Sequence, residues 1–316
     1  MIAEVYIEFM NRDYQKYLGS LLLFGSNGIV ASAIDLPSAE IVVLRSSLGA
    51  ALLCALLLMG RKSLTLHKSP RDLLLVAGSG AALGICWVFV YMAYREVGVG
   101  ITSLLYALGP VLVMAASPLL FGERLTLSAC ACFGVVVFGA LLANGPVAAG
   151  ANGMRGIAHG LAAAVAYAMM IVLCKKARTG SGLECSAVQL VAASAASIIA
   201  VAVQGIELVP IPVASIAPAL MLGLVNTGIG CYLYFSAITR LPAQTVAACD
   251  YVEPLTAVLL SAAMLGESMA PSQLFGAALV IAGAVSCEFV RRGRQASGSE
   301  ERVARDRALT TPAPSI

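Results

Sequence analysis

The sequence predicts an all-α integral membrane protein of ten transmembrane helices, arranged as two inverted five-helix repeats. Three observations predict this fold: long apolar runs, a one-sided placement of basic residues, and a motif that occurs twice. The 316 residues are 59% hydrophobic and 12% charged, with a mean hydropathy of +0.90, whereas soluble domains carry about 25% charged residues. The few charges gather between apolar runs of about twenty residues, the length with which a helix crosses a bilayer.

Ten such runs are found with a window of about twenty residues. The expected spans are Tyr17–Ile34, Glu40–Met59, Leu73–Tyr94, Val99–Phe121, Leu125–Ala143, Gly156–Cys174, Cys185–Val203, Ala214–Ala237, Ala243–Leu265 and Gln273–Phe289. Ser186 and Gln189 lower the hydropathy of the seventh. The stretch Ala31-Ser32-Ala33 in the first run could be a signal-peptidase site, but the nine similar runs that follow favour an uncleaved helix.

The basic residues indicate the orientation of these spans. Fourteen lysines and arginines fall before the first span, in one set of alternating loops, or in the cluster of Arg291, Arg292 and Arg294 after the last span, and only Arg95 and Arg155 fall in the other set of loops. Under the positive-inside rule the basic side is cytoplasmic. We therefore expect a multi-pass protein of the cell (plasma) membrane with both termini in the cytoplasm, which requires an even number of spans.

Two halves of the chain share a motif. Placing Pro110 on Pro254 also places Gly122-Glu123 on Gly266-Glu267, Ser117 on Ser261 and Gly139 on Gly283. We expect a first repeat at residues 17–143, a second at 155–290, and a disordered cytoplasmic tail at 291–316, because the tail has few large apolar residues. Five spans are an odd number, so the second repeat enters the membrane from the opposite side, as in many secondary transporters.

These residues resemble the EamA-type transporters of the drug/metabolite transporter superfamily. The resemblance rests on a proline in the fourth helix of each repeat, the Gly-Glu turn after it, and the glycine of the fifth helix. Three shorter matches are Phe24-Gly-Ser-Asn27, Leu44-Arg45 and Glu253-Pro254. It covers residues 17–290 and implies a ten-helix fold that transports small organic molecules, often by exporting amino acids or other metabolites. It does not imply which molecule is carried.

Two acids lie inside the predicted ninth span. An ionisable residue within the membrane is costly and is a candidate functional residue, and the spacing of Asp250 and Glu253 places both on one helical face. Two carboxylates this close do not both ionise easily in a medium of low dielectric, so one of them could couple proton movement to transport. Glu253 matches the Glu-Pro of the resemblance. Asp250 does not, which makes it a candidate for specificity, for example toward a cationic amine.

Arg45 lies about one turn inside the second span, and two interpretations stay open. Its side chain could extend to the lipid headgroups, or it could point inward as a counter-charge for Glu253 or for a substrate carboxylate. Six further polar or aromatic residues within spans are candidate substrate contacts. They are Asn27, Trp87, Tyr91, Tyr106, Asn226 and Tyr232.

Composition excludes several kinds of site. The nine cysteines fall almost entirely within apolar runs, where a free cysteine behaves as a small hydrophobe. Two histidines give a zinc site or a Ser-His-Asp centre little to build from, and the ATP-binding Gly-x-x-x-x-Gly-Lys-Ser/Thr motif is absent from the sequence. We expect no metal, no cofactor, no enzymatic activity and no nucleic-acid partner.

The sequence therefore favours a secondary transporter, an exporter of small metabolites such as amino acids or amines, that acts by alternating access between the two repeats. Proton coupling and passive facilitation both stay open, as does the oligomeric state. The alternatives are a lipid-modifying membrane enzyme and a membrane sensor or assembly subunit that does not transport.

Overall fold

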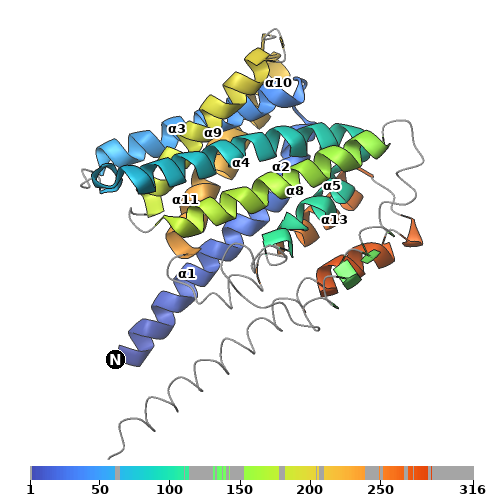
Figure 1. Cartoon of the computed structure of the whole chain (residues 1–316), viewed down its shortest axis with the longest axis horizontal. Helices are drawn as coiled ribbons and strands as arrows, with labels where there is room; N and C mark the ends of the chain where they lie inside the picture. The colour runs from blue at the N-terminus through green and yellow to red at the C-terminus, as the bar shows by residue number, and fades with distance from the viewer. Residues whose placement is uncertain are drawn as a thin grey trace, which may run out of the picture.

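The chain folds into a bundle of helices in the computed structural model (Figure 1). The structure describes residues 2–60, 65–109, 111–113, 131, 134–136, 138–139, 142, 153–177, 182–203, 205, 210–238, 249, 252–266, 270–272, 274–283 and 286. The main elements are α1 (Ile2–Gly25), α2 (Asn27–Ser32), α3 (Ser38–Met59), the 3₁₀ turn η1 (Leu66–Lys68), α4 (Pro70–Val97), α5 (Val99–Tyr106), α8 (Gly153–Lys176), α9 (Gly182–Val203), α10 (Val213–Leu220), the π-helix η2 (Met221–Ile229), α11 (Gly230–Ile238) and α13 (Val252–Met264).

Five of the described helices are long and apolar enough to cross a membrane. They are Ser38–Met59, Pro70–Val97, Gly153–Cys174, Gly182–Val203 and Val213–Ala237. Shorter apolar helices cover Val99–Val113, Val252–Met264 and Leu274–Gly283. The prediction of an all-helical membrane protein is confirmed at this level. Most of the predicted fifth span, Leu125–Ala143, the first part of the ninth, and the tail 291–316 lie outside the described residues.

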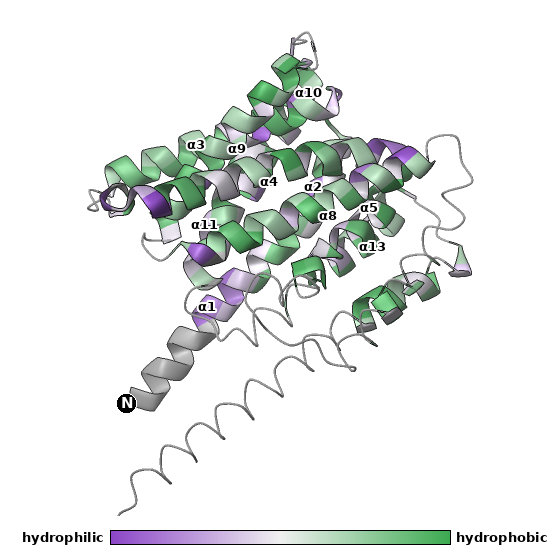
Figure 2. Ribbon diagram, viewed as in Figure 1, coloured by the Kyte–Doolittle hydropathy of each residue, from purple (hydrophilic) through white to green (hydrophobic). Residues whose placement is uncertain are grey.

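The hydropathy of the helix surfaces agrees with a lipid environment. Figure 2 shows apolar residues all around the helices of the bundle, with hydrophilic colour gathered mainly at helix ends. Large apolar side chains are exposed on the outside of the bundle, among them Leu58, Leu74, Ile199 and Val213. A helix that is apolar on every side is typical of the interior of a membrane, so this outer face is the one that contacts lipid.

The first predicted span, Tyr17–Ile34, is wrong as one continuous helix. Helix α1 begins near the N-terminus and ends at Gly25, and α2 begins at Asn27 after Ser26. The amide Nδ2 of Asn226 donates to the carbonyl oxygen of Leu23 (2.8 Å), to Ser26 Oγ (2.9 Å) and to Asn27 Oδ1 (3.2 Å). Backbone hydrogen bonds continue across Ser26, whose amide donates to the carbonyl oxygens of Leu22 and Leu23 at 3.1 Å. Asn226 adds a side-chain contact to this turn from the second half of the chain.

The span 213–238 is also irregular. Pro218 lies inside α10 and cannot donate to the helical ladder, and the π-helix η2 follows one turn later. Thr227 Oγ1 donates to the carbonyl oxygen of Leu222 at 2.8 Å, five residues back. A π-turn turns the next side chains to a different direction and is frequent at functional sites. Here it orients Asn226 and Thr227 toward α1 and α3.

Helix α4 lies at the centre of the bundle, between α8 and α9 (Figure 1). Its N-terminus has Pro70 at the first turn and Ser69 as N-cap, whose side chain accepts a hydrogen bond from the Asp72 amide. Gly80 and Gly84 bring the α4 backbone directly against α9. A Cβ at Gly80 would lie 2.3 Å from the carbonyl oxygen of Gln189, and one at Gly84 would lie 2.5 Å from that of Ala193. Small residues at this spacing allow membrane helices to pack closely.

Candidate functional site

Two overlapping pockets form a central cavity between the two halves of the chain. They enclose about 490 Å³ and about 400 Å³ of empty space. Helices α1 to α5 supply one wall, and α8, α11 and α13 supply the other. The residues that line both pockets are Phe24, Asn27, Arg45, Trp87, Tyr106 and Glu253. A largely apolar cavity with a few convergent polar groups is the usual form of a small-molecule site.

Arg45 points inward, so the alternative in which it extends to the headgroups is wrong. The side chain is 1% exposed. Its Nε donates to Thr227 Oγ1 at 2.9 Å and its Nη1 donates to the Tyr91 hydroxyl at 2.8 Å. The guanidinium carbon lies 4.3 Å from the centroid of the Trp87 ring, within the range of a cation–π interaction. Arg45 therefore places a buried positive charge on the wall of the cavity.

Glu253 brings a carboxyl group to the same cavity from the second half of the chain. It lies in the first turn of α13 and lines both pockets together with Arg45. An acid and a base of opposite halves thus line one buried space. Asp250, its predicted neighbour, lies outside the described residues, and so does Pro110.

Aromatic rings pack together beside the cavity, and we call the Tyr17–Tyr234 stack between α1 and α11 the aromatic closure. The rings of Tyr17 and Tyr234 stack with centroids 5.2 Å apart, and Phe24 contacts Tyr234 at 5.7 Å. The ring of Tyr106 packs against that of Tyr167 at 4.6 Å. Tyr17 is fully buried. The closure joins α1 of the first half to α11 of the second, so a relative movement of these two helices would open it.

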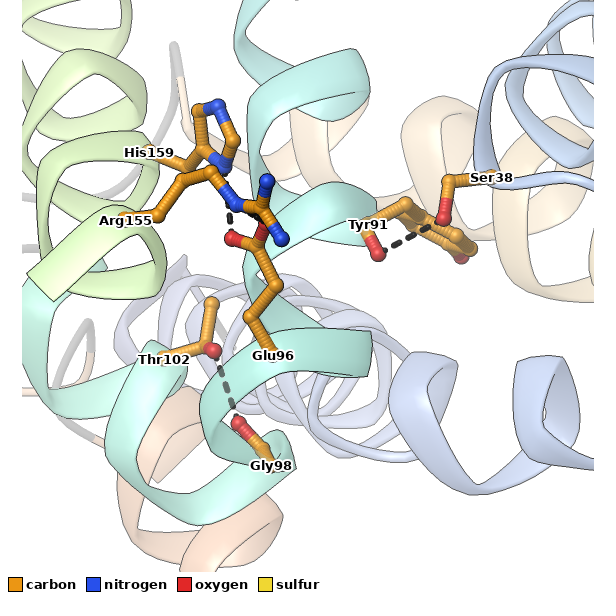
Figure 3. A network of polar contacts seen from close by, with 7 residues as sticks. All are labelled: Ser38, Tyr91, Glu96, Gly98, Thr102, Arg155 and His159. Atoms are coloured by element: carbon orange, nitrogen blue, oxygen red, sulfur yellow. Dashed lines mark hydrogen bonds and ion pairs between the residues drawn. The ribbon is translucent and has the colours of Figure 1, made fainter. Parts of the chain in front are cut away.

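A third pocket of about 650 Å³ lies at the other end of the cavity. Tyr91 and Tyr94 line both this pocket and the central one, with ring centroids 5.3 Å apart. Ser38 Oγ donates to the carbonyl oxygen of Tyr91 at 2.9 Å (Figure 3). Arg95 donates to the carbonyl oxygen of Leu36. These contacts hold Tyr91 and Tyr94 between the central cavity and the third pocket.

A polar cluster connects the end of α4 to the start of α8 (Figure 3). Glu96 accepts from Arg155 Nε at 2.9 Å, and its other oxygen lies 2.6 Å from His159 Nδ1. The His159 ring stacks on Phe89 with centroids 5.9 Å apart. Arg155 is mostly exposed, so this cluster lies at the surface end of the bundle, away from the cavity, and joins the first half to the second.

The predicted site residues separate into two groups. Arg45, Glu253, Asn27, Trp87 and Tyr106 line both pockets, and Tyr91 lines one of them. Two others take different places. Asn226 is fully buried and braces the α1 break, and Tyr232 is 39% exposed and lines none of these pockets. Tyr232 therefore stays a prediction that these three pockets do not support.

Several cavity residues were not predicted from the sequence. They are Phe24, Leu83, Tyr94, Ser103, Tyr167, Met170, Cys231, Tyr234 and Phe235. Phe24 was noted only as part of a motif. A ring inside an apolar span is usually a packing residue, and hydropathy does not indicate the face of a helix that meets the cavity. Six described cysteines, Cys54, Cys86, Cys174, Cys185, Cys231 and Cys249, are free thiols, as predicted.

Lipid-facing helices around a buried cavity with opposite charges define a membrane protein built to hold a small molecule. The chain belongs to the EamA-like transporter family, whose sequence model matches residues 16–145 and 154–287. It is thus a member of a membrane transporter family and not an enzyme.

Individual relatives agree with this assignment. The chain is 24% identical over 301 residues to the "Uncharacterized transporter YxxF" of Bacillus subtilis, which covers 90% of this chain and 92% of that protein. It is 32% identical over 237 residues to the "Probable terminal-alkyne amino-acid exporter" of Streptantibioticus cattleyicolor, over 72% and 77% of the two chains. A crystal structure at 19% identity aligns with a TM-score of 0.64, covering 89% of this chain and 98% of the other, and supports the fold alone.

Proposed function

We propose that the protein is a secondary transporter that exports small organic metabolites, such as amino acids or amines, by alternating access. Ten transmembrane helices form two inverted repeats, residues 17–143 and 155–290. Both termini, with the tail 291–316, are in the cytoplasm of a cell whose plasma membrane the protein spans. In this orientation Tyr17 lies near the cytoplasmic start of the first span and Tyr234 near the cytoplasmic end of Val213–Ala237, so the aromatic closure between α1 and α11 is the cytoplasmic one.

The observation that carries this proposal is the central cavity to which both halves contribute. Arg45 comes from the first half and Glu253 from the second, and both line the same two pockets. In transporters built from inverted repeats the substrate lies near the midplane, where the repeats meet. Burying a charge within the membrane costs free energy. An interaction with a polar ligand or with an opposite charge offsets that cost.

The two closures support alternating access. Tyr17 of α1 stacks on Tyr234 of α11 at one end, and the Tyr91–Tyr94 pair of α4 lies at the other. The breaks at Ser26 and in η2 lie beside the cavity and link the halves through Asn226. Helix segments on either side of such breaks can move separately, which would open one closure while the other stays shut.

Amino acids are the substrates to test first, because one relative carries the name of an amino-acid exporter. The purified protein is reconstituted into liposomes, and efflux of labelled amino acids and amines is compared with that from protein-free liposomes. We expect saturable efflux of at least one member of the panel, competed by unlabelled substrate. Binding without flux would favour a sensor instead. If no member of the panel binds or is transported, this substrate class is contradicted.

Replacing Glu253 with glutamine is expected to abolish efflux driven by a pH gradient, because the glutamine amide does not bind and release a proton as a carboxyl group does. Exchange of labelled for unlabelled substrate should continue. Asp250→Asn is expected to act in the same direction. Glu96→Gln is the control, since Glu96 belongs to the cluster at the end of α4 and does not line the cavity. Gradient dependence that is unchanged in both the Glu253 and the Asp250 variant would exclude proton coupling through these acids and leave passive facilitation.

A further inference from the structure

The guanidinium of Arg45 has hydrogen-bond donors for which the described residues provide no acceptor. Of its five N–H groups, Nε uses one on Thr227 and Nη1 uses one on Tyr91. Nη2 is buried and has no hydrogen-bond partner in the part of the chain that the structure describes. Both Nη2 donors therefore stay free, and pairs of parallel guanidinium N–H groups are how arginine binds a carboxylate through two hydrogen bonds.

The partners that Arg45 does have are all neutral. Thr227 and Tyr91 are hydroxyls and Trp87 is a ring. The carboxylate that lines the same two pockets is that of Glu253. A neutral shell orients a charge without cancelling it, and a buried donor left unpaired costs free energy. An anionic ligand would satisfy both the charge and the free donors.

The position of the group also fits a ligand. Arg45 lines both pockets of the central cavity. The Trp87 face and the two hydroxyls hold the guanidinium plane, and a planar donor that is already oriented loses little entropy when it binds. The rest of the cavity wall is mainly aromatic and aliphatic, which suits a small apolar side chain.

We propose that the guanidinium of Arg45, through its unpaired Nη2 group, binds the carboxylate of the transported molecule. This inference rests on the proposed function and narrows it, because it selects amino acids and other carboxylates over simple amines. The shell of Thr227, Tyr91 and Trp87 positions the arginine but does not itself select the carboxylate.

The test compares two ligands that differ only at the carboxyl group. L-Propargylglycine, a small amino acid with a terminal alkyne, and its primary carboxamide are titrated against the purified protein, and dissociation constants are measured by calorimetry. We expect the acid to bind about 30-fold more tightly than the amide, the factor expected for charge-assisted hydrogen bonds. In Arg45→Gln this ratio should fall to near 1, and Arg45→Lys should keep an intermediate ratio because it keeps the charge but not the fork.

Arg155→Gln is the control, because it removes a positive charge at the exposed cluster and does not touch the cavity. It should leave the ratio as in the wild type. If Arg45→Gln does not fold, the wild-type ratio alone decides, since equal affinity for acid and amide would overturn the carboxylate site. If amino acids are transported but the acid and the amide bind with equal affinity, this inference is overturned and the proposed function stands. If amino acids are neither bound nor transported, the inference and the proposed function are both overturned.

Discussion

Replacing Gly80 with alanine is expected to lower the melting temperature of the purified protein and its yield as a monodisperse species. The added Cβ would lie 2.3 Å from the carbonyl oxygen of Gln189 and 2.6 Å from its Cα. Both atoms belong to the α9 backbone, so no side-chain rotation relieves the contact and α4 must move away from α9. Overpacking of this kind costs about 1–3 kcal/mol. The effect is measured by thermal unfolding in detergent.

Gly78→Ala on the same helix is the matched control. A Cβ there would meet only the Cδ1 atom of Leu173, at an ordinary 3.5 Å. Alanine is the better helix former by about 1 kcal/mol, so this change should leave stability equal or slightly raised. Gly84→Ala should behave as Gly80→Ala does, because its Cβ would meet the Ala193 backbone at 2.5 Å. Equal melting temperatures for the variants at 78 and 80 would contradict the tight crossing of α4 and α9.

Replacing Glu184 with glutamine is expected to have the second large effect on stability. Glu184 lies in the first turn of α9, is 3% exposed, and accepts four hydrogen bonds from the segment that follows α3. Its carboxylate receives the Thr65 amide (2.9 and 3.1 Å), the Thr65 hydroxyl (3.0 Å) and the Leu66 amide (2.8 Å). Glutamine turns one acceptor oxygen into a donor that faces other donors. The loss should be about 2–3 kcal/mol.

Two changes at Thr65 calibrate this result by the same unfolding measurement. Thr65→Ser keeps both the amide and the hydroxyl and should be close to the wild type. Thr65→Val removes only the hydroxyl bond to Glu184, at 3.0 Å, and should cost clearly less than Glu184→Gln. A Glu184→Gln protein as stable as Thr65→Ser would mean that this contact does not tie the α3–α4 connection to α9.

Hydropathy predicts the existence of the long helices well. The spans expected at Glu40–Met59 and Leu73–Tyr94 agree with α3 and α4 to within a few residues. Even the polar seventh run forms a full helix, because Ser186 and Gln189 are buried against other helices instead of facing lipid. Gln189 Nε2 donates to Ser79 Oγ at 3.1 Å. The average apolarity of a run was therefore sufficient, although it did not reveal where the polar groups would find partners.

The breaks in the helices could not be predicted from hydropathy. The turn at Ser26 is contacted by Asn226, about two hundred residues away in sequence, and no local pattern encodes that contact. Pro218 did offer a signal for the irregular stretch in 213–238. The inward direction of Arg45 was one of two open alternatives, because the sequence does not reveal that Tyr91 and Thr227 would lie within hydrogen-bonding distance of it.

The cavity was predicted in its charged members and less well in its apolar ones. Arg45 and Glu253 stood out because charges are rare inside spans, and both line the cavity. Tyr232 was chosen on residue type alone, and it lines none of the three pockets. Tyr167 and Tyr234 were not predicted, because a tyrosine that packs in the core and one that lines a cavity look alike in a single sequence.

The central claim is that the cavity between the halves faces each side of the membrane in turn, and a native cysteine reports on it. Cys231 lines the central cavity, whereas Cys86 is fully buried and does not line it. Variants in which Cys231 or Cys86 is the sole remaining cysteine are treated with a small charged methanethiosulfonate. The reagent is added either to intact cells or to inverted vesicles. The transported substrate is included in parallel samples.

We predict that Cys231 reacts from both faces of the membrane, that substrate slows both reactions, and that Cys86 reacts from neither. Labelling of Cys231 from one face only, at a rate that substrate does not change, would contradict alternating access through this cavity.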